Sequence, residues 1–135
     1  MTRLRRAFGL VAGAFILLSS IAHTFLGTPS LNAELSQINA PSDLSSSIRI
    51  AWVFGGAAML ALGCLTLAHF LKAASSHESI VSARAVQLIG LTYTAFGVWA
   101  LVVSGMELFF LGFLAPGVIL LACARKSTEA AARAG

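Results

Sequence analysis

The sequence has few charged residues. Only 10% of its 135 residues are charged and 58% are hydrophobic, whereas about 25% charged residues is usual in soluble globular proteins. A soluble domain of this size exposes too large a share of its area to hide so much apolar surface. The composition therefore predicts a single domain that has the lipid bilayer as its solvent.

Motifs for chemistry are also scarce. The two cysteines, Cys64 and Cys123, lie in apolar runs without a CxxC spacing, which excludes a thioredoxin-type redox pair and a zinc knuckle. There is no GxSxG, no HExxH, no glycine-rich phosphate loop and no pair of carboxylates inside an apolar run. The sequence therefore favours a protein that is not an enzyme, without excluding one.

The net charge of +4 comes from basic residues at the ends of apolar runs. No dense basic stripe with interleaved aromatic residues is present, so a nucleic-acid partner is not expected. The partners expected are the lipid bilayer and either further copies of the chain or a larger membrane complex.

Four apolar runs are present, and their approximate ranges are 8–27, 50–71, 85–104 and 108–124. A membrane helix needs ~20 mostly apolar residues, and a spanning backbone must satisfy its own hydrogen bonds, so each run should be helical. The sequence predicts an all-α, integral membrane, four-helix up-and-down bundle in which the fourth span is the shortest.

The basic residues predict the orientation of these spans. With a cytoplasmic N-terminus only Arg49 lies outside, and eight basic residues lie inside, which is a strong positive-inside signal. Both termini are then cytoplasmic, and we expect a bacterial cytoplasmic (inner) membrane. The eight inner residues are Arg3, Arg5, Arg6, Lys72, Arg84, Arg125, Lys126 and Arg133.

The first run has an alternative interpretation as a signal peptide. Basic residues at 3–6 precede an apolar stretch, and Ser20 and Ala22 are small residues in the −3 and −1 positions of a cleavage site. The apolar run continues through Phe25 and Leu26, however, and reaches a length that can span. We therefore favour an uncleaved anchor over cleavage after Ala22.

The outer loop predicts a short amphipathic helix. Thr28 and Pro29 are typical of a helix start, and residues 39–41 end the helix. We expect it to lie on the outer membrane surface or over the mouth of the bundle. Ser42 and Asp43 cap the next helix, which runs through Arg49 into the second span. The apolar stripe of the short helix consists of Leu31, Leu35 and Ile38.

Small residues predict how the spans pack, because membrane helices associate through close contact of small side chains. A GxxxG pair in the first span is also compatible with a homodimer face. Pro116 is expected to kink the fourth span. The predicted packing glycines are Gly9, Gly13, Gly55, Gly56, Gly63, Gly90, Gly97 and Gly112.

Four side chains form a candidate polar site near the outer surface: His23, Arg49, Trp52 and Glu107. An imidazole beside a carboxylate can relay a proton or hold a metal. Each also has a simpler role. Glu107 suits the first turn of a helix, Trp52 suits an interfacial anchor, and His23 and Arg49 suit lipid headgroups.

No cofactor or metal is expected. Haem held by two histidines needs both at one depth, but His23 is near the outer surface and His69 near the inner one. At ~1.5 Å per helical residue, the two are roughly 20 Å apart along the membrane normal.

The chain resembles small four-helix bacterial membrane proteins of the DoxX-like kind. The similarity rests on the outline of the chain, on His23 at the end of the first span, and on Arg49-Ile50-Ala51-Trp52 at the start of the second. It implies no particular activity.

Three functions are therefore open. The first is a non-enzymatic accessory or self-associating membrane subunit. The second is binding of a lipid- or quinone-like small molecule at the outer mouth, and the third is a membrane enzyme using His23 and Glu107. The enzyme requires these two side chains to lie within hydrogen-bond reach of each other.

Overall fold

The computed structural model describes residues 2–72 and 82–132, and the side chains of 2–71 and 82–124. In these ranges the chain is helical with short turns and has no strand. The elements are α1 (Arg3–Ile21), η1 (Ala22–Gly27), α2 (Thr28–Gln37), α3 (Ser42–Lys72), α4 (Ala83–Val103), η2 (Leu108–Phe110) and α5 (Leu111–Ala132).

The helices have membrane dimensions. Three are long and apolar enough to span a bilayer, namely Arg3–Gln37, Ser42–Leu71 and Ala83–Val103, and Leu108–Ala124 is a shorter apolar helix. The prediction of an all-α chain with membrane-length helices is confirmed. Most of the predicted inner loop, together with Arg133, lies outside the described residues, as do the side chains of Lys72, Arg125 and Lys126.

The first span and the predicted outer-loop helix form one continuous rod, joined by the π-helical turn η1. In π geometry an N–H pairs with the carbonyl five residues earlier, and the partner of the Thr24 carbonyl would then be Pro29, which has no N–H. The Thr28 hydroxyl donates to this carbonyl instead. The chain therefore passes Pro29 without a break.

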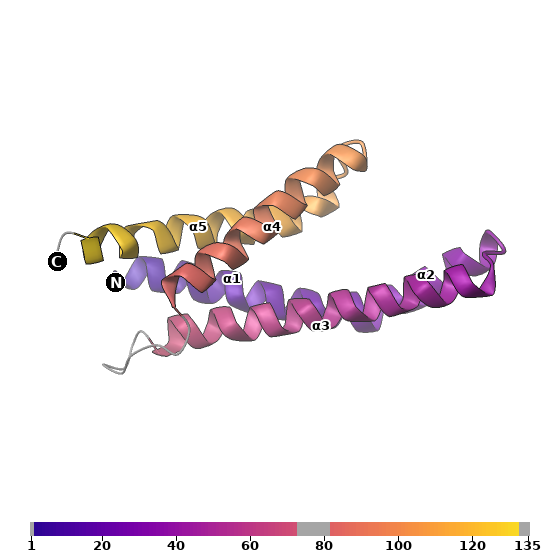
Figure 1. Cartoon of the computed structure of the whole chain (residues 1–135), viewed down its shortest axis with the longest axis horizontal. Helices are drawn as coiled ribbons and strands as arrows, with labels where there is room; N and C mark the ends of the chain where they lie inside the picture. Colours follow the sequence, from indigo (N-terminus) through magenta and orange to yellow (C-terminus); the bar gives the residue numbers. More distant parts are fainter. Residues whose placement is uncertain (1, 73–81, 133–135) are drawn as a thin grey trace.

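The α2 helix does not lie over the mouth of the bundle. The predicted placement over the mouth is therefore wrong, and the placement on the outer membrane surface stays a prediction. Among the described elements α2 contacts only η1 and α3, because the rod runs on beside α3 (Figure 1). The end of α2 at Gln37 and the start of α3 at Ser42 agree with the predicted caps, and α3 passes unbroken through Arg49. Asn39, with φ 48°, makes the reversal between them.

Successive long helices run in alternate directions, with both termini at one end of the molecule (Figure 1). The main contacts form two pairs, α1 with α3 and α4 with α5, and α1 also packs on α5. The pairs lie together at the end that holds the termini and diverge toward the other end. A short turn with positive φ at Gly105 and Met106 joins α4 to η2.

Glycines bring the helices of each pair together. A Cβ on Gly63 of α3 would lie 2.9 Å from the Leu17 nitrogen of α1, and one on Gly97 would lie 2.7 Å from the Leu114 nitrogen of α5. Gly9 and Gly13 are buried against α3. The GxxxG face of the first span is therefore used within the chain.

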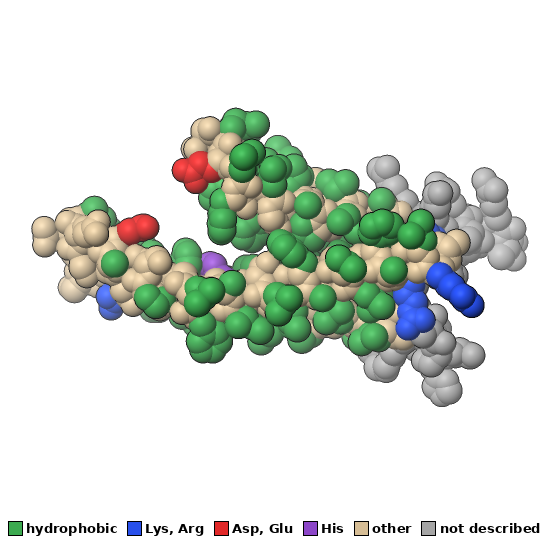
Figure 2. Space-filling view, turned by 180° about the vertical axis from the view of Figure 1, so that it is seen from behind, with side chains coloured by type: hydrophobic (Ala, Val, Ile, Leu, Met, Phe, Trp, Pro, Cys, Tyr) green, Lys and Arg blue, Asp and Glu red, His purple; other side chains and the backbone are tan. Residues whose placement is uncertain are grey.

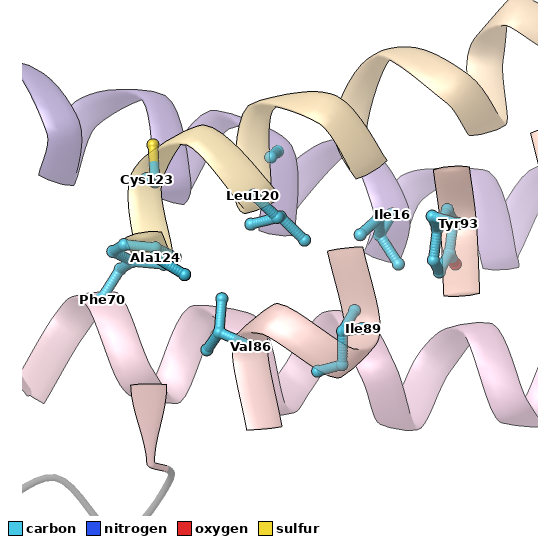
Figure 3. Close-up of a cluster of buried hydrophobic side chains, with 9 residues drawn as sticks. Ile16, Phe70, Val86, Ile89, Tyr93, Leu120, Cys123 and Ala124 are labelled. Atoms are coloured by element: carbon cyan, nitrogen blue, oxygen red, sulfur yellow. The ribbon is translucent and has the colours of Figure 1, made fainter. Parts of the chain in front are cut away.

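Figure 3 shows the buried core, which lies toward the end of the molecule that holds both termini in Figure 1. There Arg5 and Cys123 join α1 to α5, because the Arg5 guanidinium donates to the Cys123 carbonyl and the Cys123 thiol donates to the Arg5 carbonyl at 3.4 Å. Pro116 lies inside α5, which continues through it. The core residues are Ala12, Ile16, Phe70, Val86, Ile89, Tyr93, Leu120, Cys123 and Ala124.

Candidate functional site

A cavity of ≈ 730 Å³ opens where the two helix pairs diverge. Figure 2 shows this hollow between the two arms of the molecule. Its walls come from α1, η1 and α3 on one side and from α4, η2 and α5 on the other. The lining residues are Phe15, Ser19, Ala22, His23, Leu26, Gly27, Trp52, Met59, Tyr93, Phe96, Phe109, Phe110, Gly112 and Phe113.

One wall of the cavity is a cluster of phenylalanines from α4, η2 and α5. Phe113 is its centre, with its ring centroid 5.0 Å from that of Phe96 and 6.4 Å from that of Phe110. Such edge-to-face and offset contacts are the favoured geometries of aromatic pairs. The wall offers aromatic faces and edges to a bound molecule.

The opposite wall carries His23 and Trp52, which are joined through both side chains and backbones. Their rings stack with centroids 4.0 Å apart and an interplanar angle of 18°. The Trp52 indole N–H donates to the His23 carbonyl at 3.1 Å, and the His23 Nε2 lies 3.0 Å from the Trp52 carbonyl oxygen. Gly56 allows this close approach, because its Cα faces Thr24 and the edge of the His23 ring.

His23 lies in the π-helical turn η1, and single π turns are frequent at functional sites. Just before it, the buried Ser20 hydroxyl donates to the Gly56 carbonyl at 2.8 Å, which fixes the end of α1 on α3. His23 is thus held on a rigid support at the edge of the cavity.

Tyr93 forms the boundary between the cavity and the core, because it belongs to the core cluster and also lines the cavity. It is the central residue of α4 and is only 5% exposed. Its hydroxyl has no hydrogen-bond partner among the described residues. Buried polar groups are almost always paired, so this unpaired hydroxyl, which neighbouring atoms cover next to the cavity, is an exception.

The structure brings together two of the four predicted site residues, His23 and Trp52. Arg49 lies elsewhere, where its Nε donates to the Asn32 side chain at 2.8 Å and ties α3 to α2. Glu107 is exposed, precedes η2 and does not line the cavity. It makes no hydrogen bond or ion pair with His23, so the acid–base pair that an enzyme would need is not formed.

Tyr93 and the phenylalanine wall were not predicted from the sequence. The signal for Tyr93 was present, because the only tyrosine of the chain falls in the middle of a span, whereas tyrosine usually lies at the membrane interface. The phenylalanines gave no signal, since they resemble lipid-facing residues.

The lining contains no Asp, Glu, Lys or Arg. Among the described residues, no group of three His, Cys, Asp or Glu side chains is placed to hold a metal ion. Comparison with known protein families, with curated proteins and with solved structures found no match. The resemblance to DoxX-like proteins therefore stays a prediction.

Proposed function

We propose that this protein binds an apolar, ring-bearing small molecule, lipid- or quinone-like, in the cavity between its two helix pairs. The observation that carries the proposal is the cavity itself, of ≈ 730 Å³ with mostly aromatic and apolar lining. Ligand sites in proteins typically measure about 300–1,000 Å³ and combine such lining with a few placed polar groups. Here His23 and Ser19 supply such groups, and Tyr93 also lines the cavity.

The form of the cavity favours a ring with an apolar tail. The Phe113 cluster and the Trp52 indole supply faces and edges for a ring on opposite walls. At the rim, Leu26 and Phe109 are 72% and 75% exposed, so a tail can leave the cavity over apolar surface.

In this proposal four helices cross a bacterial inner membrane with both termini in the cytoplasm, and the cavity lies toward the outer leaflet. The distribution of eight basic residues against Arg49 supports this orientation. The shortest span, Leu108–Ala124, begins beside the cavity, where η2 follows the turn from α4.

The other two functions have less support from the geometry. A role as an accessory or self-associating subunit stays a prediction, but the glycine faces that suggested it pack within the chain. An enzyme using His23 and Glu107 lacks the contact between the two side chains.

Binding can be tested with a probe that has a ring and a tail but no hydrogen-bond donor, the dimethyl ether of a decyl-substituted hydroquinone. The variant Gly112→Phe adds a ring where a Cβ has 3.8 Å of clearance to Phe15 and the residue lines the cavity. The control Leu111→Phe adds a ring at the adjacent residue, which does not line it. Titration in detergent measures the dissociation constant, expressed per mole of micellar detergent.

We expect saturable binding to the wild type and to Leu111→Phe, with a loss of at least about tenfold in affinity for Gly112→Phe, because filling the cavity removes the space for the ring. Equal, non-saturating uptake by all three proteins would mean that the probe only partitions into the micelle, and the proposal would fail.

A further inference from the structure

We infer that the cavity selects a neutral ring that carries a hydroxyl donor, a phenol or hydroquinone, through His23 Nδ1. This inference rests on the proposed function and specifies its ligand class. It concerns the chemistry of the head group, whereas the proposed function concerns only the apolar cavity.

The hydrogen-bond partner of His23 Nε2 determines which ring nitrogen carries the proton. A backbone carbonyl only accepts hydrogen bonds, so the contact of 3.0 Å between His23 Nε2 and the Trp52 carbonyl requires the proton on Nε2. In the neutral ring the other nitrogen, Nδ1, then has a free lone pair and is an acceptor.

The packing of the ring directs Nδ1 away from α3. The Nε2–Cδ2 edge faces α3, because the Cβ positions of Gly55 and Gly56 would lie 3.6 Å from Nε2 and 3.4 Å from Cδ2. In an imidazole, Nδ1 is the atom opposite that edge. One face of the ring is covered by Trp52, and the residue lines the cavity.

No described residue donates to His23 Nδ1, so the donor must come from a bound molecule or from water. A ligand that presents only carbonyl or ether oxygens would place an acceptor against this acceptor and leave both unpaired. Leaving a part-buried polar group unpaired lowers affinity, by roughly tenfold for one lost hydrogen bond, so the site discriminates against such a ligand.

Tyr93, on the opposite helix pair, also lines the cavity, but neighbouring atoms cover its unpartnered hydroxyl. His23 is therefore the polar group on which the selection of the head group depends. No lining residue is Lys or Arg, and this disfavours anionic head groups such as phosphate, because an unpaired charge is costly in a low-dielectric site.

The test compares two probes that differ in whether the two ring oxygens carry hydrogen or methyl: decyl-hydroquinone, held reduced, and its dimethyl ether. Each is titrated in detergent into the wild type, into His23→Phe, which keeps a ring but removes the acceptor, and into Leu111→Phe. The last is the control, because Leu111 does not line the cavity and the change leaves His23 and Trp52 intact. Far-UV circular dichroism and gel filtration check that each variant is folded.

For the wild type we expect the hydroquinone to bind about tenfold more tightly than the ether, as one hydrogen bond to a part-buried acceptor predicts. This preference should vanish in His23→Phe and persist in Leu111→Phe. If the wild type binds both probes equally, the inference fails while the proposed function stands. If it binds neither, the proposed function itself fails. The wild-type comparison decides the matter even if a variant does not fold.

Discussion

His23 and Trp52 hold each other through four groups at once, since their rings stack at 4.0 Å and each side chain bonds to the other's backbone carbonyl. This pair fixes α1 and η1 on α3 at one end of the molecule. Arg5 and Cys123 make a similar reciprocal pair between α1 and α5 at the other end. The α1 helix is thus tied to α3 within its own pair and to α5 of the other pair. The cavity opens beside the His23–Trp52 contact.

The tautomer of His23 is the first prediction. In protein labelled with ¹⁵N-histidine, the ring of His23 should carry its proton on Nε2, because the Trp52 carbonyl accepts from that atom. Nitrogen NMR distinguishes a protonated ring nitrogen from an unprotonated one, and His23→Phe identifies the resonances. A proton on Nδ1 in the neutral ring would contradict the structure and remove the acceptor from the cavity.

The π-helical turn gives a second prediction. Thr28→Val removes the hydroxyl that donates to the Thr24 backbone carbonyl and should cost about 0.6 kcal/mol, the average that double-mutant cycles give for hydrogen bonds made by polar side chains in a membrane protein. In a Pro29→Ala background the cost should shrink, because residue 29 then has an N–H of its own.

Unfolding by SDS in mixed micelles measures both costs, and the four proteins form a double-mutant cycle. An equal cost of Thr28→Val in both backgrounds would show that the hydroxyl does not replace the missing N–H.

Two glycines of the α4–α5 pair should respond differently to one added methyl group. Gly97→Ala places a Cβ 2.7 Å from the Leu114 nitrogen, so the helices must move apart, at a cost of about 1–3 kcal/mol. Gly112→Ala meets only Phe15, at 3.8 Å, and should be nearly neutral. The same SDS unfolding measures both, and an equal loss would contradict the close contact at Gly97.

The orientation in the membrane can be measured with single cysteines in a Cys64→Ala, Cys123→Ala background. A membrane-impermeant maleimide should label Gln37→Cys in intact bacterial spheroplasts, and Ser82→Cys only after permeabilisation. Both positions are exposed in the structure. The reverse pattern would overturn the assignment of the basic end to the cytoplasm.

The sequence was sufficient to predict the helices and their approximate ends, because apolar runs of membrane length and caps such as Ser42 are local features. It did not reveal the continuous rod. Thr28 and Pro29 resemble a helix start, and only the π turn with its hydroxyl replacement allows the chain to continue.

The site was only partly predictable for a different reason. His23 and Trp52 stood out as rare polar residues near one surface, and they do lie together. Arg49 and Glu107 stood out equally, but they lie outside the cavity because the two helix pairs diverge toward that end. The divergence depends on which helices contact one another, and these contacts cannot be predicted from a short stretch of sequence.

The most direct test of a ligand in the cavity uses the two tryptophans of the chain. Trp52 lines the cavity, whereas Trp99 is 60% exposed and does not. A ring-brominated form of the dimethyl ether probe quenches tryptophan fluorescence on contact. It is titrated in lipid nanodiscs into Trp99→Phe, which retains Trp52, and into Trp52→Phe, which retains Trp99. We predict saturable quenching of Trp52 and only weak, linear quenching of Trp99, while linear and equal quenching of both would contradict binding in the cavity.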